Sequence, residues 1–227
     1  MTTVLGLIGA GRIGSALGRL ATAAGLDVVV SNSRGPETLA DLVRSWGRRA
    51  QAADVRDAAL AGDLVVVTVP LGGCATLPVA ELDRRELTSS EPVQRQLPGS
   101  RVVKAFNNID FRRLELLARP AGAADRSALP AAGDDERAKT EARDLLDLLG
   151  YDAVDAGTLA ESRRFEPDTP VYVQPYLPPR PQGLSGDEDT MRWFLRCPGA
   201  VLSAGRVEAL VRTATRQSPA AARERLN

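Results

Sequence analysis

The sequence predicts an α/β protein built on a doubly wound, mostly parallel β-sheet, with a small helical C-terminal extension. Strand-like apolar runs alternate with helix-like stretches through the first two-thirds of the chain. Residues 64–69, LVVVTV, form a nearly continuous apolar run, which is typical of a strand buried on both faces. A glycine-rich turn also joins the first apolar run to the first helical stretch. This alternation favours parallel strands joined by right-handed crossovers.

The elements of the first third are defined by their ends. A glycine ends the first strand, Gly25 ends the first helix, and a second helix begins at Pro36 and ends at Gly47. The expected order is strand 3–9, helix 15–25, strand 27–33, helix 36–47, a weak strand at 49–52, helix 54–61 and strand 63–70.

The remainder is expected to complete the sheet and add the extension. Segment 71–100 lacks a run of β-branched residues, which predicts a proline-broken helix at 75–87, a short helix from Ser90, and turns. We expect three more strands at 101–109, 127–133 and 151–157, and helices at 134–150, 187–196 and 204–215. The predicted domains are residues 1–165, with a shortened central strand region at 71–100, and a Pro-rich loop and helical extension at 166–227.

Composition excludes several classes of function. Basic and acidic residues balance at 29 each, so no general surface for nucleic acid or acidic lipid is expected. The chain contains no histidine, which removes histidine-based nucleophilic sites and histidine-ligated zinc. Cys74 and Cys197 match no metal or redox spacing, so no metal site is predicted. With no basic segment before a long apolar run at the start, and no apolar run long enough to span a bilayer, we expect a cytoplasmic protein.

The glycine-rich turn predicts a dinucleotide site in a Rossmann-type domain. Residues 9–14 read Gly-Ala-Gly-Arg-Ile-Gly between a strand and a helix. Gly9 permits the tight turn, Gly11 lets the backbone approach a pyrophosphate, and Gly14 allows close strand–helix packing. The helix N-terminus then favours the phosphate charge. The alternative is a tight turn without a ligand.

The end of the second strand predicts which dinucleotide binds. Residues 31–34 read Ser-Asn-Ser-Arg, where a carboxylate would hold an unmodified ribose. Two hydroxyls, an amide and the guanidinium of Arg34 would instead donate to a 2′-phosphate. The expected cofactor is therefore NADP(H), and the alternative is a surface arginine beside a turn.

At this point the chain resembles a known family. The blocks that carry the resemblance are GLIGAGRIGSALG, VVVSNSRGPETL, GDLVVVTVP, VVKAFNNI, PAAGDDERAK and VDAGTLAESRRFEP. In this order, over roughly residues 3–170, they are similar to the NADPH-dependent F420 reductases and, more broadly, to the coenzyme F420-dependent NADP oxidoreductases. Pyrroline-5-carboxylate reductases share this ancestry. The resemblance implies hydride transfer between NADP(H) and coenzyme F420, a reaction that needs no strong protein acid or base.

The resemblance also implies site residues. It matches Gly9, Gly11, Arg12, Ile13 and Gly14 to the pyrophosphate loop, Ser33 and Arg34 to the 2′-phosphate, Val69 and Pro70 to a turn beside the ribose and nicotinamide, and Ala105, Phe106, Asn107 and Asn108 to the nicotinamide pocket. In segment 71–100 the family has another central strand and a closing loop, which this sequence does not offer. If that strand is missing, the strand at Val65 would pair with the strand at Val102, and docking of F420 is in question.

No catalytic residue is assigned, and Lys104 is the one candidate. If its side chain points into the protein, beside the nicotinamide, it would donate a proton. The alternative is that the side chain points outward from the strand. A first alternative function is NADPH-dependent reduction of a small imine or other organic substrate, with Lys104 or a loop tyrosine (Tyr172 or Tyr176) as proton donor. A second is a non-catalytic NADPH-binding protein.

Several further residues have structural interpretations. Asp134, Asp135 and Glu136 are interpreted as acids at a helix start. Trp46, Trp193 and Phe194 are expected in the core or at an interface. The C-terminal helices are expected to pack either on the sheet or on the partner subunit of a homodimer.

Overall fold

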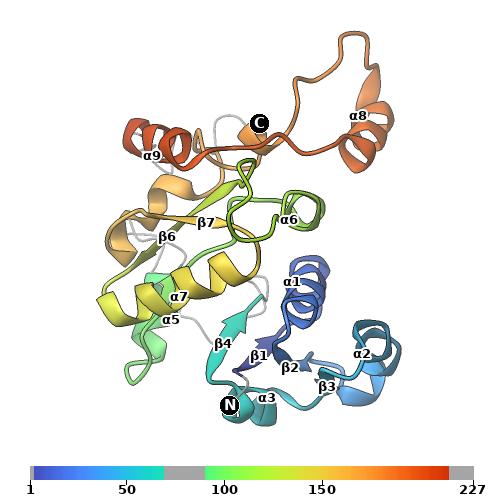
Figure 1. Cartoon of the computed structure of the whole chain (residues 1–227), viewed down its shortest axis with the longest axis vertical. Helices are drawn as coiled ribbons and strands as arrows, with labels where there is room; N and C mark the ends of the chain where they lie inside the picture. Colours follow the sequence, from blue (N-terminus) through green and yellow to red (C-terminus); the bar gives the residue numbers. More distant parts are fainter. Residues whose placement is uncertain (1–2, 69–89, 215–227) are drawn as a thin grey trace. The chain divides into compact units, whose positions relative to one another are not determined.

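The computed structural model of the protein describes residues 3–68 and 90–214 (Figure 1). The chain divides into two compact units, Met1–Ala75 and Thr76–Asn227, here called the first and second units. Each unit has its own sheet. Among the described residues, no helix has the length and apolar character needed to cross a membrane.

The first unit contains a four-stranded parallel sheet in the order β3-β2-β1-β4. Register is continuous across its centre, where Leu5 of β1 aligns with Val28 of β2 and Leu64 of β4. The elements are β1 (Val4–Ile8), α1 (Arg12–Ala23), β2 (Asp27–Ser31), η1 (Pro36–Leu39), α2 (Ala40–Trp46), β3 (Ala50–Ala52), α3 (Val55–Ala61) and β4 (Leu64–Val67). This strand order places the turn after β1 beside the ends of both β2 and β4.

Glycines allow the helices of the first unit to pack closely. A Cβ on Gly18 of α1 would lie 2.2 Å from the ring of Trp46, which is buried at the end of α2. A Cβ on Gly6 of β1 would lie 2.4 Å from the carbonyl oxygen of Ala58 in α3. Helix α1 therefore meets α2, and α3 meets β1, at distances that a side chain would prevent. Trp46 is a core residue, as expected.

The second unit contains a three-stranded sheet in the order β5-β6-β7. The central strand β6 is buried at every position, runs antiparallel to β5 and parallel to β7. The elements are α5 (Glu91–Gln96), β5 (Val103–Lys104), α6 (Phe111–Leu116), β6 (Ala128–Gly133), α7 (Glu136–Leu148), β7 (Asp152–Asp155), η3 (Leu159–Phe165), η4 (Gln174–Tyr176), α8 (Gly186–Arg196) and α9 (Ala204–Thr213).

Polar side chains tie the C-terminal segment to this second sheet. The hydroxyl of Tyr176 donates to the carbonyl of Ala128 at 2.8 Å and accepts from the amide of Asn108 at 2.9 Å. The backbone N–H of Ala128 donates to the carbonyl of Leu202 at 2.7 Å. Tyr176 is fully buried, and burial raises its pKa. Tyr176 is therefore a residue of the core of the second unit.

The Rossmann-type α/β class is confirmed. Within the first unit β4 pairs with β1, and within the second unit β5 pairs with β6. A pairing of Val65 with Val102 would join the two units and stays a prediction. The strand expected at 101–109 is reduced to two residues, because Phe106 turns the backbone to a positive φ of 62°. The helix expected at 75–87 lies outside the described residues, and the domain boundary at 165/166 stays a prediction.

Candidate functional site

The turn after β1 is held by the ends of its two neighbouring strands. The N–H of Gly9 donates to the carbonyl of Ser31 at 3.0 Å, and the N–H of Thr68 donates to the carbonyl of Ile8 at 2.8 Å. The hydroxyl of Thr68 donates to the carbonyl of Gly9 at 2.8 Å. Gly9 has a φ of 113°, a conformation that suits glycine. The three strand ends therefore form one rigid edge.

The glycines of the turn have different roles. A Cβ on Gly14 would lie 1.9 Å from the carbonyl oxygen of Gly9, so glycine is required for the strand and α1 to meet. A Cβ on Gly11 would have no heavy atom within 4 Å, so the space beside this residue is open. Gly11 is also the N-cap of α1, where no side chain caps the helix and no acid lies in the first turn. A bare helix N-terminus beside an open glycine fits the pyrophosphate of a dinucleotide.

The end of β2 presents fewer polar groups than its sequence suggests. Ser31 is buried, and its hydroxyl donates to the carbonyl of Leu7 at 3.4 Å, so it faces the sheet. The side chain of Asn32 folds the following turn: its Oδ1 accepts from the N–H of Arg34, and its Nδ2 donates to Thr38, both at 2.9 Å. Only Ser33 and Arg34 remain exposed at the end of the strand.

The charge around this corner is mixed. In the described part of the chain, Arg34 forms no ion pair, so its guanidinium is available to a phosphate. Glu37 turns back over the same loop, because a Cβ on Gly35 would lie 2.4 Å from its Oε1. Gly35 has a φ of 99°, which also favours glycine. The corner fits a 2′-phosphate, with one carboxylate nearby.

A second polar cluster lies in the second unit, where β5 meets the end of η3. The Nζ of Lys104 is 2.6 Å from the Oε1 of Glu166 and 5.7 Å from the centre of the Phe165 ring. Lys104 is only 7% exposed. Burial lowers the pKa of Lys104, and the carboxylate of Glu166 opposes that shift. Lys104 therefore lies inside, which decides between the two orientations left open by the sequence.

The residues after Lys104 belong to the same cluster. Phe106 is buried with its positive φ, and the amide nitrogen of Asn107 donates to the carbonyl of Phe165 at 3.1 Å. The amide oxygen of Asn107 is buried and has no hydrogen-bond donor among the described residues. Ala105 is half-buried beside them. Val69 and Pro70, expected near the ribose and nicotinamide, lie outside the described residues.

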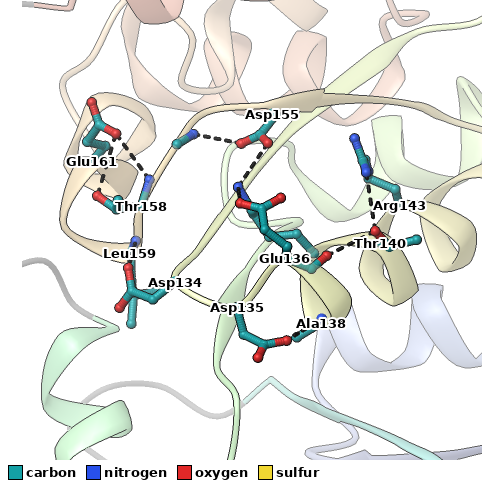
Figure 2. A network of polar contacts seen from close by, with 12 residues as sticks. Asp134, Asp135, Glu136, Ala138, Thr140, Arg143, Asp155, Thr158, Leu159 and Glu161 are labelled. Atoms are coloured by element: carbon teal, nitrogen blue, oxygen red, sulfur yellow. Dashed lines mark hydrogen bonds and ion pairs between the residues drawn. The ribbon is translucent and has the colours of Figure 1, made fainter.

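The acidic block at the start of α7 is structural (Figure 2). Asp135 caps the helix by accepting from the N–H of Ala138 at 2.8 Å, and Asp134 accepts from the N–H of Leu159 at 2.9 Å. Glu136 pairs with Lys139 at 2.8 Å. The interpretation of these acids as residues of a helix start is confirmed.

Two residues of these clusters were not singled out from the sequence. Thr68 follows β4 and carries the hydroxyl that fixes Gly9. Glu166 lies 62 residues from Lys104, and its partner becomes visible only in the fold. Glu166 lies near the end of the block VDAGTLAESRRFEP. A charged residue in a block that resembles the family was the available sequence signal for its role.

Comparison with known proteins adds a family and several similar folds. The family described as NADP oxidoreductase coenzyme F420-dependent matches residues 4–87. A solved structure of a hypothetical protein from Sinorhizobium meliloti is similar, with 31% identity, 76% of this chain and 93% of that chain covered, and a TM-score of 0.65. A search of curated proteins found no match.

Two further solved structures share the fold. A "putative F420 dependent NADP-reductase" from Arthrobacter sp. FB24 has 22% identity, with 72% of this chain and 88% of that chain covered, and a TM-score of 0.59. An imine reductase from Pseudomonas sp. has 17% identity, with 70% and 56% covered, and a TM-score of 0.52. The family match, together with the glycine turn and the matching blocks, shows that the chain belongs to the coenzyme F420-dependent NADP oxidoreductase family.

Proposed function

We propose that this member of an NADP oxidoreductase family transfers hydride between NADP(H) and coenzyme F420. The observation that carries the proposal is the exposed pair Ser33 and Arg34, which follows β2 beside the open glycine turn. A guanidinium and a hydroxyl suit a 2′-phosphate, whereas an NAD site would offer a carboxylate there. The F420 part of the proposal is supported by the family description.

In this proposal the residues of the chain bind and orient the coenzyme, and they contribute little acid–base catalysis. Gly9, Gly11 and Gly14, with the α1 N-terminus at Arg12 and Ile13, would hold the pyrophosphate. Ser33 and Arg34 would hold the 2′-phosphate. The bound nicotinamide supplies the carbon that donates or accepts hydride. Because hydride passes directly between two carbon atoms, placement of the rings is the main requirement, and a chain without histidine is compatible with it.

The other site assignments extend this proposal. The family resemblance implies that Ala105, Phe106 and Asn107 would line the nicotinamide side, and that Val69 and Pro70 would lie beside the ribose. The unpaired amide oxygen of Asn107 supports a ligand-facing role, because a buried acceptor without a donor is costly. An NADP-binding domain at 1–165, an extension at 166–227 and a cytoplasmic location complete the proposal.

The decisive experiment is a two-part assay. NADPH and NADH are first titrated by fluorescence, and NADPH is expected to bind more tightly by at least about tenfold. Oxidised F420 is then added to protein with NADPH, and deazaflavin absorbance is followed, with loss of that absorbance expected. Equal affinity for both coenzymes would contradict the assignment of Ser33 and Arg34 to the 2′-phosphate. Tight NADPH binding without F420 turnover would contradict the F420 assignment and favour a non-catalytic NADPH-binding protein or another substrate.

A second candidate function is NADPH-dependent reduction of a small imine. The buried ion pair between Lys104 and Glu166 favours it, because imine reduction needs a proton as well as a hydride. The assay offers a cyclic imine with NADPH and compares wild-type protein with Lys104→Met. Imine turnover that Lys104→Met abolishes, with F420 left unreduced, would support this function over the first.

A further inference from the structure

The hydroxyl of Thr68, the residue that follows β4, lies against the glycine turn between β1 and α1. It donates to the carbonyl of Gly9 at 2.8 Å and lies 3.5 Å from the carbonyl of Ile8. A Cβ on Gly9 would lie 2.7 Å from this hydroxyl oxygen, and so would a Cβ on Gly14. The hydroxyl therefore occupies space that the two glycines leave free, and it ties the end of β4 to the turn.

Three successive carbonyl groups of this turn are hydrogen-bonded within the first unit. The carbonyl of Gly9 accepts from Thr68. The carbonyls of Ala10 and Gly11 both accept from Ser15, the first from its hydroxyl at 3.3 Å and the second from its N–H at 2.8 Å. Because each carbonyl oxygen has a donor in the protein, the partial negative charges of the turn are held on its packed side.

The N–H groups of the same turn have the opposite arrangement. Within residues 3–68 and 90–214, no group accepts from the N–H of Gly11 or of Ile13, which lie at the start of α1 where a helix provides no acceptor. A Cβ on Gly11 would meet no heavy atom within 4 Å, so the space on this side is open. The turn therefore presents donors to the open side and keeps its acceptors on the packed side.

We propose that Thr68 is a positioning residue for the coenzyme pyrophosphate, an inference that rests on the proposed NADP(H) site. Its hydroxyl holds the carbonyl of Gly9 on the packed side of the turn. Because an unpaired carbonyl is costly, loss of this donor would release the carbonyl toward water on the open side, where its oxygen would repel the phosphates. Thr68 therefore acts on the part that NADPH and NADH share, whereas Ser33 and Arg34 act on the part that differs.

The first test titrates NADPH and NADH by fluorescence against Thr68→Val, which keeps the shape of the side chain and removes its hydroxyl. Both coenzymes are expected to bind about three- to tenfold more weakly, the effect of one hydrogen bond, and by the same factor. Thr68→Ser keeps the hydroxyl and is expected to restore both affinities. Wild-type affinity for both coenzymes in Thr68→Val overturns the proposal, and so does a loss that Thr68→Ser does not reverse.

Thr22→Val is the matched control for this test. It removes a hydroxyl that donates to the carbonyl of Gly18 at 2.9 Å within α1, and it should leave both affinities unchanged. Thermal unfolding shows that each variant is folded at the temperature of the titration. A loss of affinity in Thr22→Val equal to that in Thr68→Val would trace the effect to α1 as a whole and overturn the role of Thr68.

The second test uses two fragments of the coenzyme and calorimetry. ADP-ribose carries the pyrophosphate without the 2′-phosphate, and adenosine 2′-monophosphate carries the 2′-phosphate without the pyrophosphate. Thr68→Val is expected to weaken ADP-ribose binding by about three- to tenfold and to leave adenosine 2′-monophosphate binding unchanged, whereas Arg34→Ala should do the reverse. Weakening of both fragments in Thr68→Val would indicate general damage to the first unit and overturn the positioning role.

The wild-type titrations separate failure of this inference from failure of the proposed function. A wild-type protein that binds neither NADPH nor ADP-ribose overturns the proposed NADP(H) site, and the role of Thr68 with it. A wild-type protein that binds both ligands, with Thr68→Val binding them equally tightly, overturns the role of Thr68 alone.

Discussion

The ammonium of Lys104 lies 2.6 Å from the carboxylate of Glu166, so a buried strand residue is neutralised by a residue 62 positions later in the chain. Lys104 is buried, whereas Glu166 is 23% exposed through its side chain. The pair joins β5 to the end of η3, next to the buried Phe106 and the amide of Asn107. The candidate pocket residues of the second unit are therefore positioned by an ion pair that brings two distant segments together.

Removing the carboxylate is expected to destabilise the protein. Glu166→Gln removes the carboxylate that pairs with the buried ammonium of Lys104, which should lower the free energy of unfolding by about 3 kcal/mol. Urea unfolding at neutral pH measures this. The matched control is Glu141→Gln, which breaks the exposed Arg137–Glu141 pair and should cost about 0.5 kcal/mol or less. Equal small effects of both variants would show that the Lys104–Glu166 pair adds nothing to stability.

The effect of Glu166→Gln should depend on pH in a definite direction. Burial lowers the pKa of Lys104, so between that pKa and the ordinary lysine value of about 10.4 the unfolded chain binds more protons than the folded one. Stability therefore rises with pH in this range, and more steeply in the variant, where the carboxylate of Glu166 no longer opposes the shift. The difference between variant and wild type should shrink as the pH is raised from 7 toward about 10. A difference that grows with pH would contradict this account.

Arg34 is expected to govern the preference between coenzymes. Arg34→Ala should weaken NADPH binding by about ten- to hundredfold, the range for losing a hydrogen bond to a charged group, and leave NADH binding nearly unchanged. Fluorescence titration of both coenzymes measures this. Arg48→Ala, which removes an exposed arginine from the α2–β3 turn, is the control. Equal weakening of both coenzymes would indicate damage to the fold, and no change would remove Arg34 from the site.

Glu37 is expected to weaken the binding of the NADPH 2′-phosphate by Ser33 and Arg34. Its carboxylate lies over Gly35, beside Ser33 and Arg34, where it repels a doubly charged phosphate. Glu37→Gln should therefore raise NADPH affinity by roughly threefold at low salt, with a smaller gain at high salt because exposed charges are screened. NADH titration is the control and should show little change. A fall in NADPH affinity would show that Glu37 supports the loop instead.

Substitutions at Gly11 and Gly14 should affect different properties, NADPH binding at Gly11 and stability at Gly14. Gly14→Ala places a methyl 1.9 Å from a backbone oxygen, so it should destabilise the fold by about 2 kcal/mol or more. Gly11→Ala meets no protein atom within 4 Å, so its thermal stability should be unchanged while NADPH binding weakens at least about tenfold. Thermal unfolding and NADPH titration of both variants measure this. Normal NADPH binding by Gly11→Ala would show that the open space is not the phosphate site.

Gly18 and Trp46 are expected to be energetically coupled. Gly18→Ala drives a methyl into the buried indole ring and should lower stability by about 1–3 kcal/mol. Trp46→Leu alone should also destabilise, because it leaves a cavity. Since a smaller residue at position 46 makes room for the methyl, the double variant should lose less than the sum of the single losses. Additive losses in urea unfolding would show that the two sites do not share this contact.

The local features of this protein were predictable from its sequence. The glycine turn, the parallel strands β1, β2 and β4, and the acids that cap α7 were all predicted, because each depends on backbone conformation or on neighbours close in sequence. The α/β class followed from the same alternation of apolar runs. Helix α6, with only six residues, was missed, because its pattern is too short to stand out from a loop.

Only the tertiary structure decided which side chains face inward and which partners they meet. Ser31 and Ser33 are two residues apart at the same strand end, but Ser31 donates to Leu7 inside the sheet and Ser33 stays exposed. Lys104 pairs with Glu166, a residue far away in the sequence. The strand expected at 101–109 is shorter than predicted, because Phe106 turns the backbone. These outcomes depend on contacts between distant segments. Sequence periodicity records the conformation of each segment, whereas the pairing of distant segments is decided by packing and by the need to neutralise buried charge.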